Sequence, residues 1–160
     1  MKIHFICRAN VLRSLIAETY LRSLNIPNIT VASSGTEADY FKPTIEPYLL
    51  RTLSVLEARG LKDYIGPASN QLTQERVDDS DLIVVMSDKV HGDASELTNL
   101  PREKTMIWNI DDIEEGPLRE QLIASGRTEE DIIYDEVTAK VDELVISLKS
   151  QGLLSKAKAG

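Results

Sequence analysis

The sequence predicts an α/β fold: one domain of three layers, with a four-stranded parallel sheet between helices on both faces. Three observations lead to this prediction. Short apolar runs alternate with segments whose apolar residues recur at helical spacing, a pattern typical of parallel strands joined by crossover helices. The run DLIVVM, residues 81–86, is apolar on both faces, which suits a strand between two helical layers. Finally, 160 residues of 42% hydrophobic composition suit a single domain with a real core.

The first half of the chain contains two predicted strand–helix pairs. Lys2–Cys7 predicts a buried strand, and Ser14–Leu24 predicts a helix because its apolar residues lie near helical spacing. Asn28–Ala32 predicts a second strand, which we expect to end in the turn sequence SSGT. Thr44–Glu57 predicts a helix with leucines along one side, and Gly60 is a typical stop signal after it.

The second half adds two strands and a long helix. Asp81–Met86 is the most strand-like run of the chain, and Lys104–Trp108 predicts the fourth strand. Glu129–Lys149 has the strongest helical pattern, with an apolar stripe along its length. We expect a single domain over residues 1–152, followed by a frayed tail at 153–160.

Charge and cysteine content exclude several classes of protein. The formal net charge is −8, so neither nucleic acid nor a membrane is expected as a partner, because both are bound through excess Lys and Arg. The single cysteine excludes an internal disulfide and a cysteine zinc cluster. The apolar N-terminal run is too short for a signal peptide, and no stretch approaches a membrane span, so we expect a cytoplasmic protein.

The stretch CRANVLRS, residues 7–14, joins the first predicted strand to the first helix. Sites in parallel sheets form at the carboxyl ends of strands. This rule places the stretch beside SSGTEADY, after the second strand, and NIDDIEEG, after the fourth. A short loop before a helix can surround an anion with backbone N–H groups, and Arg13 adds a planar fork of donors suited to phosphate oxygens. The loop is therefore a candidate phosphate-binding site.

Cys7 lies at the base of this loop, where the surroundings favour a thiolate that could attack phosphorus. Ser14 could donate a hydrogen bond to the sulfur and help it leave later. The alternative is structural: Cys7 is a small buried residue, and Arg8 and Arg13 are solvated. Arginine followed by serine at this spacing is uncommon by chance, which favours the functional interpretation. Neither histidine has metal-ligand spacing with another His or Cys, so we expect no metal and no cofactor.

The same stretch resembles the signature of the low-molecular-weight protein tyrosine phosphatases, C-x-G-N-[IT]-C-R-S-P-x-A-E, and stands here as CRANVLRSLIAE. Further along, SSGT is similar to the family's SAGT, DLIVVM to its D-L-I-L-x-M strand and WNIDDI to its W-D-I-x-D-P. The matches run in order over nearly the whole chain. The resemblance implies a metal-independent phosphomonoesterase that hydrolyses phosphotyrosine or an aryl phosphate.

The resemblance also implies a role for each matching residue. Cys7 would attack phosphorus and form a phosphocysteine, Arg13 would bind the phosphoryl oxygens, and Asp112 would protonate the leaving oxygen and then activate water. The phosphate-binding loop would consist of Arg8, Ala9, Asn10, Val11, Leu12, Arg13 and Ser14. The residues that hold the loop in shape would be Asn10, Ser14 and Ser33.

The assignment of the acid depends on the alignment from Trp108, which favours Asp112 over its neighbour Asp111. Both could instead belong to an acidic surface loop, because IDDIEE carries four carboxylates. Ile113 stands where the family has proline, which leaves this loop less constrained.

Other positions near the site also depart from the family pattern. Ala9 replaces a glycine, Leu15 replaces a proline, and Pro67 lies near the place of a supporting histidine. Ala9 is strained if its position requires a positive φ and costs little otherwise. Because binding needs only the loop and Arg13, a catalytically weak pseudophosphatase that acts as a regulatory module, binding phosphate or phosphoproteins, is the alternative function.

Hints about the substrate come from four residues. In the family that the sequence resembles, threonine at the position of Val11 accompanies phosphoarginine substrates and isoleucine accompanies phosphotyrosine. Val11 is apolar like isoleucine, so the resemblance favours an aryl phosphate over phosphoarginine. The resemblance implies an aromatic wall beside the site at the place of Tyr40, which could instead be an ordinary half-buried tyrosine. Glu114 and Glu115 would repel an acidic phosphopeptide. The expected partner is therefore a phosphorylated protein or a small aryl phosphate.

Overall fold

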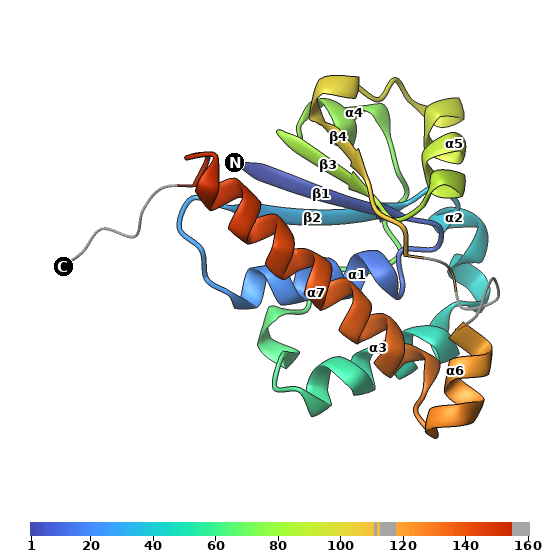
Figure 1. The fold of residues 1–160 in the computed structure, drawn as a ribbon. Helices are drawn as coiled ribbons and strands as arrows, with labels where there is room; N and C mark the ends of the chain where they lie inside the picture. Colours follow the sequence, from blue (N-terminus) through green and yellow to red (C-terminus); the bar gives the residue numbers. More distant parts are fainter. Residues whose placement is uncertain (111, 113–117, 155–160) are drawn as a thin grey trace.

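The computed structural model describes residues 1–110, 112 and 118–154, and a parallel sheet of four strands lies at its centre. The strand order is β2-β1-β3-β4, so the first strand lies inside the sheet (Figure 1). This architecture confirms the predicted fold class. The strands are β1 (Lys2–Cys7), β2 (Thr30–Gly35), β3 (Leu82–Val85) and β4 (Thr105–Ile107).

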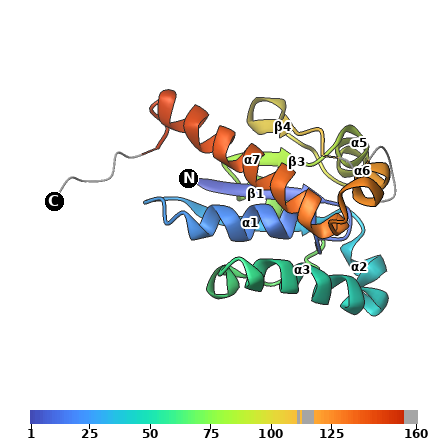
Figure 2. The same ribbon diagram turned by 60° about the horizontal axis from the view of Figure 1, so that its bottom comes forward.

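Helices cover both faces of the sheet (Figures 1 and 2). On one face lie α1, α7 and, further out, α3, whereas α4 and α5 lie on the other. In the described part of the chain, no helix combines the length and the apolar composition needed to cross a membrane. The helices are α1 (Arg13–Ser23), α2 (Ala38–Phe41), α3 (Glu46–Ala58), α4 (Gln74–Asp78), α5 (Asp88–Leu97), α6 (Leu118–Ser125) and α7 (Glu129–Ser150), with 3-10 turns η1 (Lys42–Thr44), η2 (Lys62–Tyr64) and η3 (Arg102–Lys104).

The core has two parts because successive residues of a strand point to opposite faces of a sheet. Ile3 and Phe5 of β1 are fully buried and join the cluster under α1 and α7. Ile6 joins the cluster under α4 and α5, with Val77 and Val90. Burial on both faces explains why β1 reads as an almost continuous apolar run.

Strand β2 differs from its sequence prediction. It begins at Thr30 and extends to Gly35, so the sequence SSG belongs to the strand and not to a turn. Parallel pairing with β1 explains the difference, because Ser33 and Gly35 lie opposite Phe5 and Cys7 in the ladder. Ladder hydrogen bonds involve only the backbone, so small polar residues can occupy a strand that tertiary contacts hold in place.

The bounds of helices α4 and α5 were not predicted from the sequence, because both helices are short and lack a long apolar stripe. Each helix carries a start signal: the hydroxyl of Thr73 accepts from the N–H of Arg76, and that of Ser87 accepts from the N–H of Val90, both at 3.3 Å.

Near the C-terminal end of the described residues, Leu154 is buried in the core. Packing therefore continues into the segment expected to be a frayed tail, whose last residues, 155–160, lie outside the described ones.

His4 is a buried, titratable residue in the middle of β1. Its side chain is 1% exposed, and its Nε2 lies 2.6 Å from the hydroxyl of Ser34. Burial, reinforced by the nearby cations Arg76 and Lys2, lowers the pKa of His4 from 6.5 to about 4, while Asp79 opposes the shift. The folded protein therefore holds this imidazole neutral at pH values where the unfolded chain would protonate it.

We expect this residue to make the fold sensitive to acid. The stabilisation is fully present above pH 6.5 and is lost as the pH falls to about 4, since only the unfolded chain gains a proton in that window. At about 1.4 kcal/mol per pH unit, the shift corresponds to roughly 3 kcal/mol. Urea unfolding of the parent and of His4→Gln between pH 7.5 and 4 measures the effect. Parallel stability curves for the two proteins would contradict it.

Candidate active site

The carboxyl ends of all four strands meet at one edge of the sheet, and Cys7 ends the inner strand β1 there. The chain then forms a loop and enters α1 at Arg13. Two backbone bonds tie this loop to the end of β2: the N–H of Thr36 donates to the carbonyl of Cys7, and the N–H of Glu37 donates to that of Arg8. The parallel register of β1 and β2 thus fixes the position of the cysteine loop.

Cys7 is 3% exposed, and its sulfur receives hydrogen bonds from its own loop. The backbone N–H of Asn10 donates to Sγ at 3.3 Å, and the hydroxyl of Ser14 lies 2.8 Å from it. Because the side-chain amide of Asn10 already donates to the oxygen of Ser14, at 2.8 Å, the serine proton is available to the sulfur. Donors arranged in this way stabilise negative charge on the sulfur.

Asn10 is the centre of the network that holds the loop. Its side chain is fully buried, and its Nδ2 donates to Ser14 and Ser33, both at 2.8 Å. Its Oδ1 accepts from the backbone N–H of Asn70 at 2.9 Å and from the Asn70 side chain at 3.2 Å. The amide is therefore satisfied on both sides and links the loop to β2 and to Asn70. Asn70 lies three residues after Pro67 and supplies a support that the sequence analysis did not assign.

The backbone conformation of the loop shows whether the alanine at position 9 is strained by a positive φ. The residue with positive φ in this loop is Asn10, at 56°, and Ala9 is not among the described residues with positive φ. Asparagine tolerates the left-handed region better than most residues. Alanine at position 9 is therefore free of the strain considered from the sequence.

Gly35 lets the end of β2 approach the cysteine loop closely. A Cβ at this position would clash with the carbonyl oxygen of Arg8 and would lie 2.8 Å from the nitrogen of Asn10 and 2.9 Å from the carbonyl carbon of Ala9. All three are backbone atoms, which cannot rotate away as a side chain could. The requirement for glycine here is one of space, because its φ is not positive.

We expect Gly35→Ala to displace the loop. If the loop performs the phosphate ester hydrolysis expected from the sequence, kcat for p-nitrophenyl phosphate should fall by about 100-fold, the cost of misplacing reacting groups by about an ångström. Gly92→Ala in α5 is the matched control, because a Cβ there meets nothing within 4 Å. Steady-state kinetics and thermal unfolding of both variants separate a misplaced loop from a lost fold. A folded Gly35→Ala protein with parental kcat would show that the loop tolerates the methyl group.

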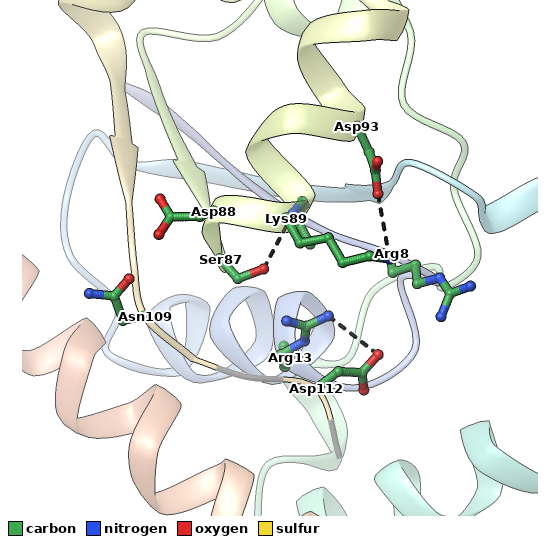
Figure 3. Close-up of a pocket in the computed structure, with 9 residues that line it drawn as sticks. Arg8, Arg13, Ser87, Asp88, Lys89, Asp93, Asn109 and Asp112 are labelled. Atoms are coloured by element: carbon green, nitrogen blue, oxygen red, sulfur yellow. Dashed lines mark hydrogen bonds and ion pairs between the residues drawn. The ribbon is translucent and has the colours of Figure 1, made fainter. Parts of the chain in front are cut away.

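Arg13 is the buried cation of the site. Its side chain is 5% exposed, and its Nη1 donates to the backbone carbonyl of Ile110 at 2.9 Å. Its Nη2 lies 3.7 Å from Oδ2 of Asp112, which comes from the segment after β4 (Figure 3). The structure thus brings together the arginine and the acid that the sequence analysis assigned to one site. Asp111, Ile113, Glu114 and Glu115 lie outside the described residues.

A cavity of about 130 Å³ lies in front of this pair (Figure 3). Two of the three expected loops border it, the cysteine loop and the segment after β4, but no residue of SSGTEADY does. The third border is the segment after β3, which was not expected at the site from the sequence. Parallel strands end at a common edge, so the same rule could have found this segment from the capping sequence SD after DLIVVM. The cavity is lined by Arg8, Arg13, Ser87, Asp88, Lys89, Val90, Asp93, Asn109 and Asp112.

The remaining loop residues have different surroundings. Val11 and Leu12 are 8% and 9% exposed and contribute to the core, so they anchor the loop through packing. Arg8 forms an ion pair with Glu37, and its guanidinium lies 4.9 Å from the ring centroid of Phe41. This position leaves Arg8 at the rim of the site, in contrast to the buried Arg13.

Tyr40, the expected aromatic wall, is 77% exposed and is not among the residues that line a cavity beside the loop. Its neighbour Phe41 takes that place and contacts Tyr40 edge to face, with ring centroids 5.0 Å apart. Both residues belong to the short helix α2, in which adjacent side chains point in different directions. A prediction that is wrong by one residue in such a helical turn therefore assigns the wrong side chain to the cavity wall, here Tyr40 instead of Phe41.

Glu18 and Arg22 form a partly buried ion pair on α1, behind the loop. Glu18 is 3% exposed, and its Oε1 lies 3.2 Å from Nη2 of Arg22. Burial raises the pKa of Glu18, although Arg22 and then Ser33 oppose the shift. Arg22 also donates to the carbonyl of Tyr64, which joins α1 to the segment that leads to Asn70. A further bond from Arg22 to the carbonyl of Val31 joins α1 to β2.

Comparison with known proteins identifies the family. A model described as low molecular weight phosphotyrosine protein phosphatase matches residues 2–157. The chain belongs to this family. Among solved structures, Vibrio vulnificus Wzb in complex with benzylphosphonate is 25% identical, with a TM-score of 0.66 over 94% of this chain and 97% of that one. A low molecular weight protein tyrosine phosphatase from Bacillus subtilis is 22% identical, with a TM-score of 0.63 over 94% and 98%, and shares the fold.

Arsenate reductases are also similar to this chain. The glutaredoxin arsenate reductase of Synechocystis is 29% identical over 83 residues, or 52% of this chain. The match spans 57% of that curated relative's length. The thioredoxin-dependent arsenate reductase Cg_ArsC1' of Corynebacterium glutamicum is 20% identical, with a TM-score of 0.61 over 94% of this chain and 62% of that one. Membership of the phosphatase family therefore supports a phosphatase without naming its substrate.

Proposed function

We propose that this protein is a phosphomonoesterase that hydrolyses phosphotyrosine or other aryl phosphates through a phosphocysteine intermediate. The observation that carries the proposal is the placement of Cys7. Its sulfur accepts from the N–H of Asn10 at 3.3 Å and lies 2.8 Å from the hydroxyl of Ser14, at the start of a loop that leads to the buried Arg13. This arrangement suits a thiolate beneath a bound phosphoryl group.

In the first step, the Cys7 thiolate attacks phosphorus and the bond to the aryl oxygen breaks. Arg13 and the backbone N–H groups of the loop bind the phosphoryl oxygens, and Asp112 gives its proton to the leaving oxygen. In the second step, the Asp112 carboxylate takes a proton from water, whose oxygen attacks phosphorus. The sulfur–phosphorus bond breaks and phosphate leaves, while the Ser14 hydroxyl stabilises the departing thiolate.

The single cysteine favours this activity over arsenate reduction that proceeds through an internal disulfide. Arsenate reduction oxidises thiols to a disulfide, and with Cys7 as its only cysteine the chain cannot form that bond internally. Phosphate ester hydrolysis needs one nucleophilic thiol and no net oxidation. The retained Cys7, Arg13 and Asp112 likewise favour an enzyme over a module that only binds phosphate.

The test is hydrolysis of p-nitrophenyl phosphate by the reduced protein between pH 4.5 and 8, with and without orthovanadate. We expect turnover that vanadate inhibits. A folded, reduced protein that binds vanadate but shows no turnover would instead support the phosphate-binding module. Release of oxidised glutathione from arsenate and reduced glutathione, without ester hydrolysis, would point to arsenate reduction.

A further inference from the structure

A second, larger cavity of about 700 Å³ begins at the cysteine loop and runs between α3 and the start of α7. We call it the α3–α7 groove. Figures 1 and 2 show that the beginning of α7 lies near α3. The groove is lined by Arg8, Ala9, Val11, Leu12, Phe41, Thr44, Ile45, Tyr48, Arg51, Thr52, Asp112, Glu129 and Glu130. It is several times larger than the cavity at Arg13, so a phosphoryl group alone would leave it unfilled.

The groove has an apolar floor and aromatic groups on one side. Leu12 and Ile45 are each 9% exposed and form part of the core beneath it. Phe41 and Tyr48 stand on the α3 side, where Tyr48 is 55% exposed. Phe41 is partly buried. Aromatic groups that are at least partly exposed beside a buried apolar floor are typical of surfaces that bind polypeptide segments.

The two sides of the groove carry opposite charges. On α3, the guanidinium of Arg51 lies 5.6 Å from the ring centroid of Tyr48, which holds it in place. On the opposite side, Glu130 lies in the first turn of α7. Among the described residues, neither Arg51 nor Glu130 forms an ion pair, with each other or with a third residue. Within residues 1–110, 112 and 118–154, both charges are therefore available to a ligand.

We propose that the α3–α7 groove binds the polypeptide that flanks the phosphorylated side chain, and that Arg51 and Glu130 determine specificity by pairing with an acidic and a basic flanking residue, respectively. The inference rests on the proposed phosphatase activity, because the groove opens from the loop that would hold the phosphoryl group. A peptide with both charges, one on each side of the phosphotyrosine, fits the groove better than an acidic or a neutral peptide. Partly exposed ion pairs of this kind select among ligands even where each adds little affinity.

Four phosphotyrosine peptides test the proposal: one neutral, one acidic on both sides, and two that carry acidic and basic flanks in opposite orders. For the parent, we expect kcat/KM to be about tenfold higher for one of the two mixed peptides than for the neutral peptide. Arg51→Glu and Glu130→Lys should each remove most of this preference. The double variant should prefer the mixed peptide of opposite order.

Two controls carry the same charge changes elsewhere. The control variants are Lys62→Glu and Glu143→Lys. Lys62 lies in η2 and Glu143 lies in the second half of α7, and neither residue lines the groove. Both should keep the parental order of peptides. Equal kcat/KM for all four peptides, or a preference that survives both groove substitutions, would overturn the inference. Hydrolysis of p-nitrophenyl phosphate distinguishes a failure of the groove inference from a failure of the proposed function. If the parent hydrolyses this ester but shows no peptide preference, only the groove inference fails. Absence of ester turnover contradicts the proposed function.

Discussion

Replacement of Cys7 by serine is expected to lower kcat for p-nitrophenyl phosphate by about 10⁴-fold or more, because the proposed nucleophile is lost. A serine hydroxyl carries little negative charge at neutral pH, whereas the N–H of Asn10 and the hydroxyl of Ser14 are placed to stabilise a thiolate. Binding of vanadate should persist, since Arg13 and the loop N–H groups remain. Steady-state kinetics and a vanadate titration of the same protein measure both quantities.

The substitution changes one atom in a buried site, so the fold of the Cys7→Ser protein must be compared with that of the parent by circular dichroism and thermal unfolding. Rapid quenching of the parent during turnover should yield a protein heavier by one phosphoryl group, located on Cys7 by mass spectrometry. The serine variant should lack this cysteine adduct. Parental turnover by a folded Cys7→Ser protein would contradict the mechanism.

Asp112→Asn is expected to have the second largest effect, a loss of about 10² to 10⁴ in kcat that depends on the leaving group. Asparagine keeps the shape of the side chain but cannot transfer a proton to the departing oxygen. The loss should therefore be greater with phosphotyrosine than with p-nitrophenyl phosphate, whose leaving group is stable as an anion. The ion pair with Arg13 at 3.7 Å is also lost, so KM should be measured beside kcat.

Asp111→Asn is the matched variant, with the same chemical change one residue earlier. If Asp112 is the acid, Asp111→Asn should keep kcat within a few-fold of the parent for both esters. A strong, leaving-group-dependent loss in Asp111→Asn, with Asp112→Asn unaffected, would transfer the role of acid to Asp111. Equal small effects in both variants would favour the phosphate-binding module, in which no acid is needed.

Much of the fold could be predicted because it follows from local patterns. The bounds of β1 agree with the prediction, and those of α1 and α7 agree within one residue at each end. β1 is buried on both faces and is therefore an almost continuous apolar run, whereas the buried residues of α7 recur at helical spacing. β2 was misplaced because Ser33, Ser34 and Gly35 are not apolar, and their strand conformation depends on pairing with a distant segment.

The sequence by itself determined the chemistry of the candidate site: one cysteine at a strand end, an arginine six residues later and an acidic pair after the last strand. Only the tertiary structure decided which side chains complete it. Asn70 reaches Asn10 across 60 residues, Gly35 is needed for the close approach of β2, and Phe41 takes the place expected for Tyr40. The physical reason is that residue type and spacing encode local conformation and reactivity, whereas support, clearance and the wall of a cavity arise from segments that meet only when the sheet assembles.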